Sequence, residues 1–306
     1  MMKCRIVPAA LFMLMALTAC TEELEFSSSF EKKVTVNCLL GDSDVQTMTL
    51  TWNTVKGVFK YEYVEDADAM LFLDGKEVGR FSYEGKGIWT IEHHPVAGGT
   101  YRLEIRVPGE KLISATTTMP AKADVKRKRF DYKSETVKYF TEESRTGVFW
   151  VFVMKRNPLE MIDPDKEPEI LDSDILATVI GTDHRSVDNF NVSDQKIFTD
   201  FGTPGISLEH PAYLRISEPE DQAPYPYEFF IESELDNSIV VFRTVSDEYD
   251  KYLKTSLLKA MAYESEDDIT SYFEENRIYS NIRNGIGIFG ACSDLLIPRN
   301  FIIDQI

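Results

Sequence analysis

The chain has 306 residues, of which 43% are hydrophobic, and its 33 basic and 51 acidic side chains give a formal net charge of −18. This length is ample for about two domains, each with its own hydrophobic core. So acidic a surface repels nucleic acid, and we therefore expect no nucleic-acid partner.

The first twenty residues predict export and lipid attachment. Lys3 and Arg5 precede an apolar run over residues 9–16, which is too short to span a bilayer and is typical of a signal peptide. The next residues, Leu17-Thr18-Ala19-Cys20, resemble the lipobox of bacterial lipoproteins. That resemblance implies cleavage before Cys20 and acyl chains on its sulfur and amino group, which together anchor a protein durably in a membrane. A plain secretory signal with an unrelated cysteine is the alternative.

Two acidic residues follow the cysteine. Glu22 and Glu23 resemble the export signal that sends lipoproteins of the Bacteroidota to the outer face of the outer membrane. We therefore expect a lipid-anchored protein of the outer membrane that faces the cell exterior, with the periplasmic orientation as the alternative. On this interpretation residues 1–19 are the signal peptide and residues 20–29 form a polar tether.

Alternating apolar and polar residues predict an antiparallel β-sandwich over residues 30–121. Asp74-Gly75 lies between two alternating runs and is a strong hairpin signal, because glycine accepts the positive φ of a tight turn. The spacing of strands and turns indicates an immunoglobulin-like sandwich, although no Cys…Trp…Cys pattern is present. The expected strands cover residues 31–40, 47–52, 69–73, 76–83, 88–91, 101–107 and 112–118.

Residues 120–133 are predicted to contain the boundary between two domains. Six basic side chains concentrate here in an otherwise acidic protein. Such a run is usually a solvated connector. A docking patch for an anionic partner such as lipopolysaccharide is the alternative.

Residues 122–306 are predicted to form a second antiparallel β domain with one packed helix over residues 247–264. Ser246 is a good N-cap, and acidic residues follow it in the first turn, where the helix dipole favours them. One apolar stripe should pack on the sheet; its members are Tyr249, Leu253, Leu257, Ala260 and Met261. The expected strands cover residues 147–155, 175–180, 212–216, 227–232 and 239–245.

Three patterns suggest ligands and are weak on inspection. Residues 285–290 match the dinucleotide motif G-x-G-x-x-G, but no βαβ unit surrounds them, so the glycines more plausibly let a strand bend closely against the helix. His93 and His94 are adjacent and point to opposite faces of an extended chain, which disfavours a shared zinc ion. The acidic loop Asp163–Glu169 suggests calcium but lacks the EF-hand order, so a solvated loop is favoured.

The cysteines and aromatic residues leave further alternatives open. Once Cys20 carries lipid, Cys38 and Cys292 are available for a disulfide in an exported protein, although we favour two unpaired, buried thiols. Trp89, Tyr225 and Tyr227 are candidates for stacking on a sugar or peptide ligand. Burial in a core is the commoner fate of such side chains.

No catalytic motif is present. The chain lacks G-x-S-x-G, H-E-x-x-H and P-loop sequences, and its 4 histidines supply a nucleophile–histidine site poorly. Paired carboxylates could serve a glycosidase, but among 51 acidic residues nothing singles out a pair. We therefore expect no enzyme activity, no cofactor and no metal site, with an exported hydrolase as the alternative.

Several blocks of the chain together resemble one known family. Residues 34–40, 73–76, 98–103, 115–120, 247–252 and 279–290 resemble, in order, a Bacteroidota lipoprotein family called domain of unknown function 4249. Residues 279–290 are the most specific block. The resemblance implies an outer-membrane lipoprotein found beside TonB-dependent transporters, and it implies no catalytic residues.

These predictions combine into one functional hypothesis. The protein is a surface lipoprotein, held in the outer membrane by lipid on Cys20, that acts as a non-catalytic binding or accessory component of a TonB-dependent nutrient-uptake system. Its expected partners are the transporter complex and a glycan or peptide ligand. A purely structural accessory of an outer-membrane complex is a further alternative.

Overall fold

The structure is a computed structural model in which most of the chain after residue 30 is described. The described residues are 31–54, 62–123, 125–131, 136–141, 148–157, 160, 162, 166–171, 173–177, 180–181, 187–190, 213–216, 227–232, 237–264 and 278–299. The predicted signal peptide and tether lie outside this part of the chain. From Lys33 onward the chain belongs to one compact unit.

The described residues from 31 to 118 form a two-sheet sandwich. One sheet contains strands in the order β1-β2-β7-β6, and the other sheet contains strands in the order β5-β4-β8-β9. In chain order this is the arrangement of an immunoglobulin-like domain, so the predicted fold is confirmed. The strands are β1 (Val34–Leu40), β2 (Val45–Trp52), β3 (Glu62–Tyr63), β4 (Asp68–Leu73), β5 (Lys76–Arg80), β6 (Ser82–Gly85), β7 (Ile88–Glu92), β8 (Thr100–Arg106) and β9 (Ile113–Thr118).

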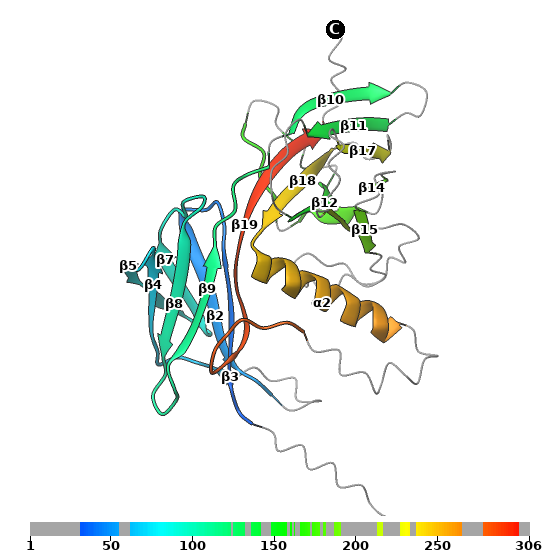
Figure 1. Ribbon diagram of the computed structural model, residues 1–306. Coiled ribbons are helices and arrows are strands. Elements are labelled where there is room, and N and C mark those ends of the chain that lie inside the picture. The colour runs from blue at the N-terminus through cyan, green and yellow to red at the C-terminus, as the bar shows by residue number, and fades with distance from the viewer. Residues whose placement is uncertain are drawn as a thin grey trace, which may run out of the picture. The chain divides into compact units, whose positions relative to one another are not determined.

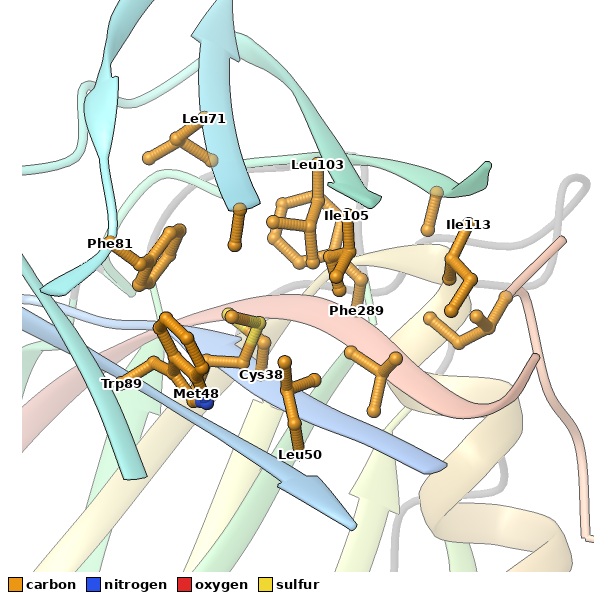
Figure 2. Close-up of a cluster of buried hydrophobic side chains, with 14 of the residues drawn as sticks. Cys38, Met48, Leu50, Leu71, Phe81, Trp89, Leu103, Ile105, Ile113 and Phe289 are labelled. Atoms are coloured by element: carbon orange, nitrogen blue, oxygen red, sulfur yellow. The ribbon is translucent and has the colours of Figure 1, made fainter. Parts of the chain in front are cut away.

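The alternating sequence pattern produces the sandwich core. Along β1, Val34, Val36, Cys38 and Leu40 are buried while the residues between them are more exposed. Figure 2 shows side chains of both sheets meeting in this core, with Trp89 and Met48 on one side and Leu71 and Leu103 on the other. Each such side chain contributes about 1.5–3 kcal/mol when it is fully buried.

One predicted strand crosses from one sheet to the other. The sequence predicts one strand over residues 76–83, but β5 pairs with β4 and β6 pairs with β7. The chain changes sheets at Phe81, whose side chain is buried in the core between them. The crossing divides the expected strand into two short ones.

The long strand β19 (Ile286–Arg299) is shared by both halves of the chain. Its first part pairs in parallel with β1, with Thr35 opposite Ile286 and Leu40 opposite Ala291. Its second part pairs antiparallel with β18 (Ser238–Val245), with Val245 opposite Cys292. Figure 1 shows β19 running on from the sandwich to β18. The sandwich sheet thus continues into the sheet of the second half.

The second half is also built of strands. β18 lies in the same sheet as β12 (Val148–Lys155) and β16 (Tyr213–Ile216), and short strands extend it: β13 (Ile175–Ala177) and β15 (Val187–Phe190). A separate sheet has the order β10-β11-β17-β14. Its strands are β10 (Val125–Asp131), β11 (Thr136–Thr141), β17 (Tyr227–Glu232) and β14 (Ile180–Gly181). The basic run predicted as a connector therefore contains strand β10.

Helix α2 (Asp247–Glu264) has the predicted bounds. The Ser246 hydroxyl accepts a hydrogen bond from the Tyr249 backbone N–H at 3.3 Å, which is the N-cap geometry. Tyr249, Leu253 and Leu257 are buried in a second hydrophobic cluster with Trp150 and Ile288. The predicted stripe is confirmed at these three positions, whereas the side chains of Ala260 and Met261 lie outside the described part of the structure.

The predicted domain boundary near residue 121 stays a prediction. By sequence β19 belongs to the predicted second domain, and by pairing it belongs equally to the sheet of the first. Phe289 and Ala291 of β19 are members of the sandwich core. The two halves therefore share one strand.

Candidate functional site

Several predicted site residues lie outside the described residues. Cys20 is among them, so its lipidation stays a prediction. Asp163 and Asp165 of the acidic loop are also outside, while Glu167 and Glu169 are exposed. Within the part of the chain that the structure describes, no three His, Cys, Asp or Glu side chains are grouped so that they could hold a metal ion. Calcium binding by the loop is therefore untested.

The two adjacent histidines have separate partners. His93 Nε2 lies 2.9 Å from the hydroxyl of Tyr101, which also accepts a hydrogen bond from the Val96 N–H. Burial, and secondarily the neighbouring His94, lowers the pKa of His93, consistent with a neutral ring beside the tyrosine hydroxyl. His94 instead contacts Asp44, 3.0 Å from Nδ1 to the carboxylate.

The glycines of residues 285–290 allow close backbone approach. Gly287 has a φ of +109°, and a Cβ there would lie 2.0 Å from the carbonyl oxygen of Val36 on β1. A Cβ at Gly290 would lie 2.8 Å from the Cβ of Tyr249 on α2. The prediction that these glycines bring a strand close to the helix is confirmed, and strand β19 continues where a dinucleotide site needs a helix.

The two remaining cysteines are free thiols. Cys38 belongs to the sandwich core, whereas Cys292 packs against the cluster that includes α2. Their strands are neighbours, but the side chains serve different hydrophobic clusters. Burial raises the pKa of each thiol to about 12, so neither is a nucleophile near neutral pH.

Of the aromatic candidates, only Trp89 has a described side chain. It is 4% exposed, and its indole N–H donates to the Val64 carbonyl at 3.3 Å. Trp89 is therefore part of the core and unsuited to stacking on a ligand. Tyr225 lies outside the described residues, and for Tyr227 the structure describes the backbone in β17 only.

A polar cluster lies where β18, β19 and α2 meet. Arg243 forms two hydrogen bonds with the Asp294 carboxylate, each 2.7 Å long, and its guanidinium lies 5.3 Å from the ring centroid of Phe152. Burial alone lowers the pKa of Arg243, but the Asp294 carboxylate outweighs it and raises that pKa well above the usual value. Burial also raises the pKa of the Tyr249 phenol. Arg243 therefore stays charged and paired.

Two more carboxylates hold elements together in the same way. Asp42, in the loop after β1, accepts hydrogen bonds from the Ser293 hydroxyl at 2.8 Å and the Asp294 N–H at 2.9 Å. Asp250 of α2 accepts the Trp150 indole N–H at 3.0 Å and two N–H groups of Arg215, at 2.8 and 2.7 Å. Because these carboxylates are each met by several donors, we interpret them as structural.

A different group of charges faces solvent on the β5-β4-β8-β9 sheet. Arg80 Nη1 lies 2.7 Å from one Asp68 oxygen, and Arg106 Nη1 lies 3.7 Å from the other. Arg106 also approaches Glu104, 3.6 Å away, and Glu104 pairs in turn with Arg102. We call these five residues the arginine face. They form an alternating chain of charges that ends in an arginine at both ends.

The arginine face is the outward side of its sheet. On β8 the residues between its members, Leu103 and Ile105, are buried in the sandwich core. Cross-strand pairing places Thr116 of β9 opposite Arg102, and Ser114 opposite Glu104. The Arg102 guanidinium lies 4.1 Å from the ring centroid of Phe72 on the same side. Glu77 of β5 pairs with Phe72 on the same side, so this sheet surface carries three guanidinium groups, three carboxylates and the hydroxyl groups of β9.

Sequence reasoning missed the arginine face, although part of its signal is local. Arg102, Glu104 and Arg106 alternate with apolar residues in a strand that was predicted, which places them on one side. Asp68 and Arg80 join them only through strand pairing. That pairing cannot be obtained from the pattern of one strand.

Comparison with known proteins identifies the family. The family model described as "Domain of unknown function (DUF4249)" matches residues 21–295. The chain belongs to the DUF4249 family. The match spans nearly all of the described sandwich, helix α2 and most of β19, which confirms the resemblance seen in the sequence blocks. No curated protein matches this DUF4249 chain.

Solved structures add only a distant likeness. A crystal structure of a "Putative membrane anchored protein" from Corynebacterium diphtheriae is 10% identical, with a TM-score of 0.21 over 71% of this chain. The chain spans 54% of that protein's length. Among the described residues of the DUF4249 chain, no helix has both the length and the apolar composition needed to cross a membrane.

Proposed function

We propose that this DUF4249 protein is a lipid-anchored lipoprotein on the outer face of the outer membrane. There it serves a TonB-dependent nutrient-uptake system as a non-catalytic binding or accessory component. The observation that carries the proposal is the segment Leu17-Thr18-Ala19-Cys20, followed by Glu22 and Glu23. Membership of the family, which was matched from residue 21 onward, supports it.

The parts of the chain fit this role in order. Acyl chains on Cys20 hold the protein at the membrane because several chains together bind far more durably than one. Residues 20–29 act as a tether. The sandwich then presents the arginine face on its sheet. Asp294 of β19 pairs with Arg243 of β18, Asp42 joins the loop after β1 to β19, and Asp250 joins α2 to β16.

The anchor is tested by membrane fractionation. In a Bacteroidota host, Cys20→Ser should move the protein from the membrane fraction to the soluble exported fraction, and mass spectrometry should find no acylated terminus. Cys4→Ser is the matched control, since Cys4 is removed with the signal peptide and its loss should leave the protein membrane-bound. Equal membrane binding of Cys20→Ser and the parent protein contradicts the anchor.

The orientation and the partner need separate measurements. Protease added to intact cells should digest the parent protein, and Glu22→Ala/Glu23→Ala should protect it by keeping it in the periplasm.

Affinity purification from membranes should recover a TonB-dependent transporter. Turnover of glycans or peptides by the purified protein contradicts the non-catalytic role and favours the exported hydrolase.

A further inference from the structure

We propose that Asn284 is a site of spontaneous chemical modification, at which the side-chain amide is lost and an aspartate or isoaspartate remains. Asn284-Gly285 is the only Asn-Gly pair in the sequence. Glycine has no Cβ, so its backbone nitrogen is the least hindered toward the side chain of the residue before it. The modification goes beyond the proposed function, and it changes the turn that leads into β19.

The reaction needs only water. The Gly285 backbone nitrogen forms a bond to Cγ of Asn284, its proton passes through solvent to the side-chain nitrogen, and that nitrogen leaves as ammonia. The succinimide ring that results is opened by a water molecule at either of its carbonyl carbons. Opening at one carbonyl gives aspartate, and opening at the other gives isoaspartate, in which the main chain runs through the former side-chain carbon. Water is consumed and ammonia is released, with no oxidant or reductant.

The structure exposes the reacting side chain and restrains the turn around it. Asn284 is exposed and takes a φ of +59°, the left-handed conformation that asparagine tolerates. Its Nδ2 donates to the Leu112 carbonyl oxygen at 2.7 Å. The Arg283 N–H donates to the Ser114 carbonyl at 2.9 Å, and the Ser114 N–H donates to the Arg283 carbonyl at 3.3 Å. Water therefore reaches Asn284 while these bonds hold its backbone.

Gly285 adds a second restraint. A Cβ there would lie 2.9 Å from the Val34 carbonyl oxygen and 2.9 Å from Cγ2 of Ile282, so the main chain is closely packed at this point. Ring closure requires rotation about ψ of Asn284, which turns the Gly285 nitrogen toward the side chain, and the close packing opposes that rotation. The modification therefore follows local opening of residues 283–285, and its rate reports how often this turn opens.

The products weaken the turn that leads into β19. A carboxylate at residue 284 has no N–H to donate, and its negative charge faces the Leu112 carbonyl oxygen where the amide donated before. Isoaspartate also lengthens the main chain just before Ile286, which pairs with Thr35 of β1. Both products therefore loosen the turn against the neighbouring strands.

The test follows conversion in full-length protein purified in detergent, by mass spectrometry after trypsin digestion at mildly acidic pH. Cleavage after Arg283 isolates residues 284–299, in which Asn284 is the only asparagine. The mass gain of an amide-to-acid change should appear in this peptide, and an isoaspartate-specific methyltransferase should label it. Conversion should be about tenfold or more faster in urea-unfolded protein, where no turn has to open.

Asn281 is the internal control, because it lies in the separate tryptic peptide 278–283. The β-branched Ile282 that follows it hinders attack by the backbone nitrogen, so Asn281 should convert about tenfold more slowly than Asn284. Asn284→Gly accepts the same positive φ but has no side-chain amide, and its peptide should show no mass gain. Conversion of Asn281 and Asn284 at the same rate overturns the proposal.

The effect on the turn is measured with Asn284→Asp, which places one product there. Hydrogen exchange of the Ser114 and Arg283 amides should be about tenfold faster in this variant than in the parent protein. Equal exchange in the two proteins overturns the loosening of the turn. Conversion of Asn284 in urea-unfolded protein but not in folded protein overturns the modification site. None of these results depends on lipidation of Cys20.

Discussion

Among single residues, Gly287 carries the tightest constraint in the described structure. Its φ of +109° is one that L side chains rarely adopt, and its missing Cβ leaves room for the Val36 carbonyl oxygen. Gly290, another glycine of β19, is crowded by the Tyr249 side chain but does not have a positive φ. Gly287 thus fixes how closely β19 can approach β1.

We predict that Gly287→Ala lowers the free energy of unfolding by more than about 2 kcal/mol, because strained backbone and a steric clash add. Urea unfolding followed by circular dichroism measures the change. Gly41→Ala is the matched control, since a Cβ there meets nothing within 4 Å and its φ is ordinary. It should change stability by less than about 0.5 kcal/mol. Equal effects of the two substitutions contradict the assigned role of Gly287.

Residues whose role is set by their sequence neighbours could be predicted. Asp74 and Gly75 take φ values of +49° and +82°, as the hairpin signal required. The N-cap role of Ser246 was likewise visible from the residues that follow it. The pairing of Arg243 with Asp294 was not, because it joins two strands 51 residues apart in sequence. Cys38 and Cys292 were predicted to be unpaired, and both are free thiols.

At the scale of elements, the start of helix α2 is held by the Ser246 hydroxyl, which accepts two hydrogen bonds. Ser246 Oγ accepts the Tyr249 N–H at 3.3 Å and also the Ala291 N–H of β19 at 3.2 Å. The same residue donates its backbone N–H to the Ala291 carbonyl. Ser246 therefore both begins the helix and joins it to β19.

We predict that Ser246→Ala destabilises the protein by about 2 kcal/mol, more than the ~1 kcal/mol of an ordinary N-cap. The additional loss arises because the buried Ala291 N–H is left without an acceptor. Thermal and urea unfolding measure it. Ser246→Thr keeps the hydroxyl and is the control, expected to retain most of the stability. A loss of similar size in both variants means that packing, and not the hydroxyl, is responsible.

Sequence reasoning misjudged the basic run that contains β10 and the run over residues 76–83. Residues 120–133 look like a connector because basic residues dominate, yet residues 125–131 within them pair with β11 as strand β10. The run over residues 76–83 was expected to be one strand, and the pairing of its ends with different sheets divides it at Phe81. Helix α2 was predictable throughout, since its cap, dipole charges and stripe are all local signals.

At the scale of the whole molecule, β19 makes the two halves depend on each other. Phe289 is fully buried in the sandwich core, while Ile288 beside it is fully buried in the cluster under α2. Loss of either half exposes one face of the same strand. We therefore expect the described strands to unfold in one cooperative transition, despite the domain boundary predicted near residue 121.

Tryptophan fluorescence tests this expectation. Trp150→Phe leaves Trp52 and Trp89 to report on the sandwich, and Trp52→Phe/Trp89→Phe leaves Trp150 to report on the second half. In each variant the fluorescence midpoint in urea should coincide with the midpoint from circular dichroism. Phe289→Ala should lower the urea midpoints of both fluorescence transitions together. It should reduce the free energy of unfolding by about 3–5 kcal/mol. Two separated transitions show that the halves fold independently.

The shared strand also sets the order in which the protein can be finished. Ile286 is synthesised 251 residues after Thr35, the residue it lies beside, since 286 − 35 = 251. At ribosomal speed that separation lasts on the order of ten seconds or more. During this interval one side of β1 has no neighbour, and a bare strand edge invites pairing with other chains. A chain that begins to fold before β19 is complete is therefore exposed to aggregation at this edge of β1.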